Sequence, residues 1–275
     1  MPELPEVETV RRGLKNLVLD RIIQDVKIYH DGIIEYPSVK EFKSKIIGQR
    51  INDIDRYGKW LMFIMDDYYL LSHLRMEGKY NIRNNGDKLN KHEHVVFLLD
   101  DDRELRYMDV RKFGKMHLIE KDKIKTIGPL VDLGLEPWDK NLNIDYLREK
   151  YSKKRLPIKS VLLDQSIIVG IGNIYADEIL FLSGINPLVK AKDLSNEKLD
   201  SIINNTRSVL EKAINEGGTT IRSYSSVGGV HGLFQQELNV HTKAGCKCSR
   251  CGNIIKKIKV GGRGTYYCDR CQKID

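Results

Sequence analysis

The chain has 275 residues, enough for about two domains with a sizeable buried core. Its composition is 41% hydrophobic, 31% charged and 8% aromatic, which excludes a disordered, collagenous or coiled-coil protein. No apolar run approaches the ~20 residues that span a bilayer, and the acidic start MPELPEVE does not resemble a signal peptide. We therefore expect a cytoplasmic protein with no membrane partner.

The charge is distributed unevenly. The whole chain has a formal net charge of +8, and residues 240–275 hold nine basic and only two acidic residues. The first 239 residues are therefore almost neutral. A localised basic excess indicates a polyanionic partner. The alternative is a solvated basic tail.

The first predicted element is a helix over residues 3–17, in which Val7, Val10 and Leu14 recur at helical spacing. Residues 21–119 contain short β-rich stretches separated by turns rich in Asp and Asn. Several short strands at close intervals are typical of an all-β sandwich or barrel.

The pattern becomes helical from about residue 142. An apolar stripe over residues 199–214 predicts a helix that stops at Gly217-Gly218. Residues 156–166 and 174–183 predict two shorter helices. We expect an α+β multidomain fold, with an N-terminal β-sandwich domain over 1–132, a helical domain over 133–238 and a C-terminal hairpin over 239–275.

The cysteines are confined to this last segment. Cys248 and Cys251 form one C-x2-C pair, and Cys268 and Cys271 form another sixteen residues later. This spacing is typical of a zinc ribbon, in which four thiolates bind one structural Zn2+ ion. Two disulfides are the alternative, which a cytosolic location disfavours. Cys246 is left over as a spare thiol.

The N-terminus offers a candidate nucleophile. The initiator Met is commonly removed before a small residue, and its removal would give Pro2 a free secondary amine, which can attack a sugar carbon. Glu3 would then lie beside it as an acid–base partner. The alternative is that Pro2 and Pro5 only begin a helix, whose dipole Glu3 complements.

Four further residues leave alternatives open. Asn173 follows two glycines before a helix, which suits either a phosphate site or a helix cap. Met76 and Phe113 lie close to arginines, as in wedges that kink DNA, or they are strand core residues. Arg263 lies among glycines, where it can approach a phosphate or merely form a basic turn.

Seven segments are distinctive when they are taken together and in order: PELPEVETVRRGL (2–14), RYGKWL (56–61), SHLRMEGKY (72–80), DVRKFG (109–114), GNIYADE (172–178), GGTTIRSY (217–224) and the cysteine segment (248–271). Over the whole length they resemble the motifs of the bacterial formamidopyrimidine-DNA glycosylases. The order and joint presence of these motifs make chance agreement very improbable.

The resemblance implies a fold and an activity. The helical part would be a helix–two-turns–helix DNA-binding domain, and the cysteine segment a zinc-finger hairpin. The enzyme would be a bifunctional glycosylase and abasic-site lyase of base excision repair. It would remove oxidised purines such as 8-oxoguanine and formamidopyrimidines from double-stranded DNA, act as a monomer and associate with the nucleoid.

The resemblance also implies roles for single residues. Pro2 would form a Schiff base, Glu3 would be the acid–base residue, and Lys59 and Arg263 would assist β- and δ-elimination. Met76, Arg111 and Phe113 would fill the space left by the flipped base, with Arg111 bonding the opposite cytosine. His92, Asn173 and either Lys154 or Arg155 match, or lie beside, DNA-contact positions; the run Lys153-Lys154-Arg155 leaves that choice open.

The sequence departs from the family's pattern in two places. Members usually read V-Y-G-R where this chain has Val240-His241-Thr242-Lys243, and the lesion-recognition loop (225–234) has Gly-Val-His-Gly where an acidic residue is common. These differences put the lesion preference in doubt more than the catalysis. The rival hypotheses are an endonuclease VIII-like glycosylase for oxidised pyrimidines and a non-enzymatic zinc-dependent DNA-binding protein.

Overall fold

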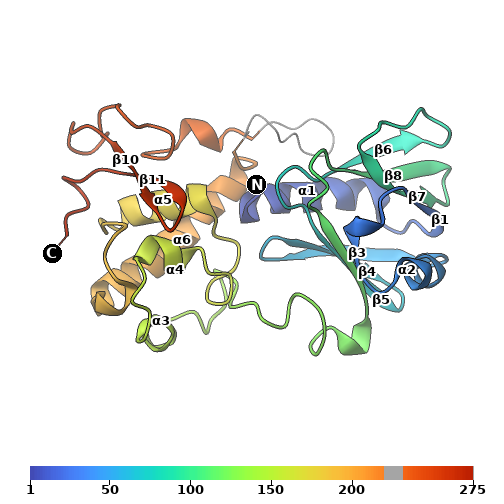
Figure 1. Cartoon of the computed structure of the whole chain (residues 1–275), viewed down its shortest axis with the longest axis horizontal. Helices are drawn as coiled ribbons and strands as arrows, with labels where there is room; N and C mark the ends of the chain where they lie inside the picture. Colours follow the sequence, from blue (N-terminus) through green and yellow to red (C-terminus); the bar gives the residue numbers. More distant parts are fainter. Residues whose placement is uncertain (220–231, 275) are drawn as a thin grey trace. The chain divides into compact units, whose positions relative to one another are not determined.

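The computed structural model describes residues 1–219 and 232–274 of the chain. They group into two compact units, residues 1–132 with 217–219 and 232, and residues 133–216 with 233–274. The predicted α+β architecture is confirmed, with an N-terminal helix, two β-sheets, a helical part and a C-terminal β-hairpin (Figure 1). The division into three domains stays a prediction.

The first unit is a β-sandwich. One sheet has the strand order β1-β7-β8-β6 and the other has the order β2-β9-β5-β4-β3. Apolar residues from both sheets and from α1 form one buried core. The strands are β1 (Ile23–Ile28), β2 (Ile34–Tyr36), β3 (Ile51–Tyr57), β4 (Trp60–Met65), β5 (Tyr68–His73), β6 (Lys79–Asn84), β7 (Glu93–Leu99), β8 (Arg103–Met108) and β9 (Lys115–Glu120).

Helix α1 (Leu4–Val18) agrees with the helix predicted from the N-terminal periodicity. It begins with a capping box, in which the backbone N–H of Glu3 donates to Glu6 Oε2 at 2.9 Å. The helix packs on β3 and β4 (Figure 1). The Glu8 carboxylate accepts hydrogen bonds from Arg11 and Arg12 on α1 and from Arg56 on β3. This ion-pair network fixes the helix that carries the N-terminus.

The sequence analysis missed helix α2 (Val39–Ile46), which lies inside the segment expected to be all β. Its signal was present in the sequence. Ser38 caps the helix by accepting the N–H of Glu41 at 3.3 Å, and Phe42 and Ile46 are buried. A serine followed three residues later by glutamate, ahead of an apolar period of four, is a helix-start pattern.

The second unit contains the remaining helices and the hairpin. The predicted helix over 156–166 is shorter than expected, because Asp164, Gln165 and Ser166 form a turn instead. Gly217 and Gly218 end the longest helix with positive φ angles, as predicted. The elements are α3 (Ile144–Tyr151), α4 (Ile158–Leu162), α5 (Asn173–Leu182), α6 (Asn196–Asn215), β10 (Lys256–Val260) and β11 (Arg263–Tyr267).

Two adjacent acidic residues of α5 connect this helix to the segment that leads into the hairpin. The Glu178 carboxylate accepts the backbone N–H groups of Asn239, Val240 and His241 at 2.8–2.9 Å. The neighbouring Asp177 is fully buried. One of its oxygens accepts Lys159 Nζ of α4, and the other lies 2.7 Å from Nδ1 of His241.

Loss of the buried Lys159 ammonium is expected to destabilise this unit strongly. Lys159 and Asp177 both have fully buried side chains, so Lys159→Met would leave a carboxylate without its main counter-charge, at a cost of about 3–5 kcal/mol. Urea unfolding measures the effect. The matched control is Lys212→Met, which removes an exposed pair with Glu237 and should change stability by less than ~1 kcal/mol. Equal effects of the two substitutions on the free energy of unfolding would contradict the stabilising role of the buried Lys159–Asp177 pair.

The departure from the family's V-Y-G-R pattern falls in this connecting segment. Thr242 has a φ angle of +65°, a left-handed conformation that favours glycine, which is the residue expected there from the family pattern. His241 packs its ring edge-on against Tyr266 of β11, with the ring centroids 5.0 Å apart. Lys243 donates its ammonium to the carbonyl of Leu238. Of the three differing residues, His241 therefore contributes to the attachment of the hairpin, through its contacts with Asp177 and Tyr266.

Candidate nucleic-acid interface and catalytic centre

The N-terminal amine lies in a cluster of charged groups within the first unit. Met1 precedes Pro2 in this chain, so the free amine belongs to Met1, and Pro2 is buried directly behind it. Burial lowers the pKa of this amine below its usual 8.0. The charge of Lys59 also lowers it, whereas the charges of Glu3 and Glu6 raise it. A lowered pKa increases the neutral, nucleophilic fraction of an amine near pH 7.

Glu3 and Glu6 are both buried beside the amine. Besides its bond to the Glu3 backbone, Glu6 accepts the N–H and the hydroxyl of Thr219 through Oε1, at 2.8 and 3.0 Å. A Cβ on Gly218 would lie only 2.8 Å from the same oxygen. Glu6 therefore ties the start of α1 to residues 218–219, the last described residues before the predicted recognition loop.

Lys59 lies in the two-residue turn between β3 and β4, and its side chain is buried. Gly58 supplies the positive φ of 54° that the tight turn needs. The positive charge of the Lys59 ammonium lowers the pKa of the N-terminal amine. The structure thus brings together Glu3 and Lys59, which the sequence places 56 residues apart, around the amine that precedes Pro2.

Glu77 is a member of this cluster that the sequence analysis did not single out. Its charge also acts on the N-terminal amine. The signal for it was present, because Glu77 follows directly after Met76 in the SHLRMEGKY motif. A lone acidic residue in a loop motif gives no indication of its partners until the sheet is folded.

Two loops of the sandwich carry the predicted base-contacting residues. Met76 lies between β5 and β6 and is half-buried. Arg111 and Phe113 lie between β8 and β9, where Phe113 is 48% exposed and the Arg111 guanidinium lies 4.7 Å from its ring centre. These positions exclude the alternative that Met76 and Phe113 are strand core residues. An exposed apolar ring beside an arginine suits contact with bases.

A buried aspartate, also missed in the sequence analysis, organises the second of these loops. Asp109 is fully buried and accepts the backbone N–H groups of Arg111, Phe113 and Gly114 at 2.8–3.0 Å. Its own N–H donates to the carbonyl of His92 at 2.9 Å. The predicted DNA contact His92 is therefore tied to the same loop.

The second unit carries the other predicted contacts. Lys154 forms an ion pair with Asp164 at 3.1 Å, whereas Arg155 is exposed. Asn173 begins α5 and donates from Nδ2 to the carbonyl of Gly264 at 2.9 Å. Its Oδ1 atom is buried and has no hydrogen-bond partner among the described residues. A buried acceptor without a partner is rare and marks a position to which a ligand can contribute a donor.

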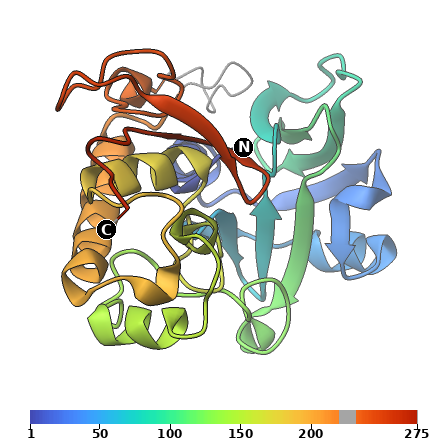
Figure 2. The same ribbon diagram turned by 60° about the vertical axis from the view of Figure 1, so that its left-hand side comes forward.

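Arg263 begins β11 at the tip of the hairpin and is exposed. The two preceding glycines have positive φ angles, and a Cβ on Gly261 would lie 2.5 Å from Ser160 Oγ of α4. Glycine at this position therefore allows the tip to pack closely on α4. Figure 2 shows the hairpin running beside α5, in agreement with the bond from Asn173 to Gly264.

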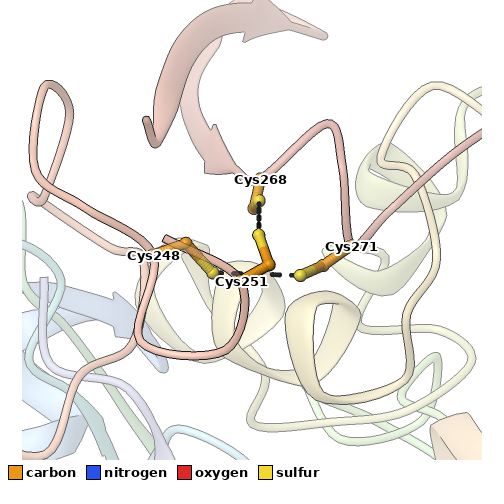
Figure 3. Close-up of side chains that lie close together, drawn as sticks. All are labelled: Cys248, Cys251, Cys268 and Cys271. Carbon is orange, nitrogen blue, oxygen red and sulfur yellow. Dashed lines mark hydrogen bonds between the residues drawn. The ribbon is translucent and has the colours of Figure 1, made fainter. Parts of the chain in front are cut away.

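Four cysteines form the metal site that the sequence predicts. The Sγ atoms of Cys248, Cys251, Cys268 and Cys271 all lie within 4.8 Å of one another (Figure 3). The Sγ separations of 3.9 Å for Cys248–Cys271 and 3.5 Å for Cys251–Cys268 are far longer than the ~2.0 Å of a disulfide. They are close to the ~3.8 Å expected around a tetrahedral ion bound at 2.3 Å. The donor set therefore fits a structural metal ion, and Cys246 is exposed outside the cluster.

Comparison with protein families decides the relationship. Residues 1–116 match the model described as the formamidopyrimidine-DNA glycosylase N-terminal domain, residues 133–225 match the H2TH domain of the same enzymes, and residues 245–274 match a zinc finger found in FPG and IleRS. The chain belongs to the formamidopyrimidine-DNA glycosylase family.

Full-length relatives agree with this family assignment. A formamidopyrimidine-DNA glycosylase of Bacillus cereus is 47% identical over 273 residues, which cover 99% of each chain, and one of Oceanobacillus iheyensis is 46% identical over 273 residues, covering 99% of this chain and 98% of the relative. Among solved structures, the Lactococcus lactis enzyme in complex with abasic-site DNA has a TM-score of 0.92 at 40% identity. This match covers 99% of this chain and all of the relative.

Two sequence features are not part of the described site. The predicted recognition loop (225–234) lies largely outside the described residues, as does most of the GGTTIRSY motif.

Among the described residues, no helix combines the length and apolarity needed to cross a membrane.

Proposed function

We propose that this protein is a bifunctional DNA glycosylase and abasic-site lyase that removes oxidised purines from double-stranded DNA. The observation that carries the proposal is the cluster around the N-terminal amine. A partly buried amine with a lowered pKa lies among Glu3, Glu6 and Lys59, in a chain whose second residue is proline. Removal of Met1 would transfer the amine to the Pro2 ring nitrogen.

The reaction follows from the chemistry of a secondary amine. Flipping the damaged nucleotide out of the duplex costs a few kcal/mol of lost base stacking. The Pro2 nitrogen attacks C1′, the glycosidic bond breaks, and its electron pair leaves with the base, which takes up a proton. The sugar ring then opens as its oxygen accepts a proton, and the C1′–nitrogen bond becomes a cationic iminium.

Strand cleavage uses the iminium as an electron sink. Removal of a C2′ proton expels the 3′ phosphate, and a second elimination expels the 5′ phosphate, so that a one-nucleotide gap with phosphate ends results. Glu3 is positioned for the proton transfers at the sugar, and Lys59 for elimination. Arg263, exposed at the hairpin tip, is the candidate for contact with the leaving phosphate.

DNA binding is assigned to residues on both units. Met76 and Phe113 would fill the space that the flipped base leaves, and Arg111 would bond the opposite cytosine. His92 and one of Lys154 and Arg155 would contact phosphates, and Asn173 would contact the DNA at a group that can donate a hydrogen bond to its Oδ1 atom. Of Lys154 and Arg155, Arg155 is the one without an ion pair to break among the described residues. We assign the metal as zinc, because Zn2+ is the usual ion for four thiolates in a closed structural site.

An activity panel tests the lesion class. The Met1-free protein is expected to cleave a duplex with 8-oxoguanine opposite cytosine and to leave phosphates at both ends of the gap. A duplex with an oxidised pyrimidine, such as thymine glycol, is expected to react at least about tenfold more slowly. Denaturing gels that resolve the end groups measure both rates. A preference for the pyrimidine would favour the endonuclease VIII-like hypothesis, and binding without cleavage of either would favour a DNA-binding protein.

A further inference from the structure

The two base-contacting loops of the β-sandwich meet at a single buried atom. The first loop (74–78) carries Met76 and ends at Gly78, and the second loop (109–114) carries Arg111 and Phe113 and ends at Gly114. The hydroxyl oxygen of Tyr107 lies 2.3 Å from where a Cβ on Gly78 would stand, and 1.6 Å from where a Cβ on Gly114 would stand. Glycine is thus required in both loops, because the hydroxyl occupies the space of a side chain.

The Tyr107 hydroxyl is connected to the aspartate that shapes the second loop. Tyr107 is fully buried and its hydroxyl donates to Asp109 Oδ2 at 3.4 Å. The same oxygen accepts the N–H groups of Phe113 and Gly114, and Oδ1 accepts that of Arg111. Burial raises the pKa of Tyr107, so the hydroxyl remains a proton donor. The Asp109 carboxylate thus accepts three N–H groups of this loop and the hydroxyl of Tyr107 on β8.

The position of the guanidinium depends on this arrangement. Lys112, between Arg111 and Phe113, has a φ angle of +57°, so the loop makes a sharp turn that the bonds to Asp109 hold. Arg111 itself is exposed and contacts the ring of Phe113. The direction of the Arg111 side chain is therefore set by the backbone of the loop, since the ring that its guanidinium contacts belongs to the same loop.

We propose that Tyr107 and Asp109 are positioning residues that set the spacing of the two loops, and thereby the discrimination between cytosine and adenine opposite the lesion. This inference rests on the proposed function, in which Arg111 bonds the opposite base. Displacement of the Arg111 guanidinium weakens its hydrogen bond to cytosine. It has little effect opposite adenine, to which no such bond is assigned. The ratio of excision rates for the two partners therefore reports on the loop.

The test compares single-turnover excision of 8-oxoguanine opposite cytosine and opposite adenine. Tyr107→Phe is expected to reduce the cytosine-to-adenine ratio about fivefold, the equivalent of one hydrogen bond of ~1 kcal/mol. Asp109→Asn is expected to reduce it further, because an amide nitrogen facing two N–H donors cannot accept them. Combined with Arg111→Ala, neither substitution should reduce the ratio any more than Arg111→Ala alone.

Tyr80→Phe is the matched control. Tyr80 is also buried, stacks edge-on against Tyr107 and donates its hydroxyl to Ser72 at 2.7 Å, a bond between strands β5 and β6 that does not involve Asp109. Tyr80→Phe removes a hydrogen bond of the same kind, but it should leave the cytosine-to-adenine ratio of excision rates within about twofold of the unsubstituted protein. An unchanged ratio in Tyr107→Phe and Asp109→Asn, or an equal loss in Tyr80→Phe, overturns the inference. If Arg111→Ala itself leaves the ratio unchanged, the proposed role of Arg111 fails as well.

Discussion

Protein that retains Met1 is expected to give no covalent product with damaged DNA under borohydride, whereas protein without Met1 gives a trapped band. The reason is that the Pro2 nitrogen is an amide when Met1 precedes it and an amine when it does not, and that the amine of an intact Met1 lies one residue away from the position proposed for the nucleophile. Pro2→Gly in the processed protein is expected to lower base excision by at least about 10², because a primary amine gives an imine that must first be protonated. Mass spectrometry of the intact chain verifies the state of Met1 in each sample.

The pH dependence of trapping gives the same prediction a second measurement. Only the neutral amine attacks, so the rate is expected to rise with pH and to level off above the amine pKa. Burial lowers the pKa of the Met1 amine, and Pro2 is itself buried, so the midpoint for the Pro2 amine should lie below that of a free peptide with the same N-terminal residues. A trapped band from Met1-retaining protein would assign the nucleophile to another group. A midpoint at or above that of the free peptide would contradict a buried position for the Pro2 amine.

Removal of the metal is expected to unfold the hairpin and to weaken DNA binding by about tenfold or more. Structural zinc contributes roughly 10–16 kcal/mol to small zinc modules, which is more than the hairpin's own core can replace. That core is small, with Phe181 of α5 and Val240 packed on Cys248, Ile255 and Cys268. The hairpin also carries Arg263 and most of the chain's excess positive charge. Binding should therefore also show a weaker salt dependence.

Two cysteine variants make this test specific. Cys268→Ser removes a buried thiol of the cluster and should reproduce the effect of chelation. Cys246→Ser changes an exposed thiol only five residues from Cys251 and should retain the metal and full DNA affinity. Fluorescence anisotropy measures binding, and a colorimetric metal assay measures the bound ion. Full affinity of metal-free protein, or loss of the metal in Cys246→Ser, would refute the assignment of the four ligands.

Elements with strong local signals could be predicted from the sequence. The periodicity of Val7, Val10 and Leu14 predicted the first helix, Gly217-Gly218 predicted the end of the last one, and two C-x2-C pairs predicted the cluster of four cysteines. Each of these depends on a few neighbouring residues, whose spacing dictates one face or one coordination geometry. The motifs also gave the family, which the comparisons confirmed.

Which residues act together became visible only in the folded chain. Glu77 joins the amine cluster, and Tyr107 reaches Gly78 and Gly114, because the strands of the sandwich bring these positions together. Asp109 becomes the acceptor for a whole loop because burial leaves it no water to bond. Such contacts depend on strand pairing over long sequence separations. The sequence shows which residues are present, but it does not show which of them lie close together in the folded chain.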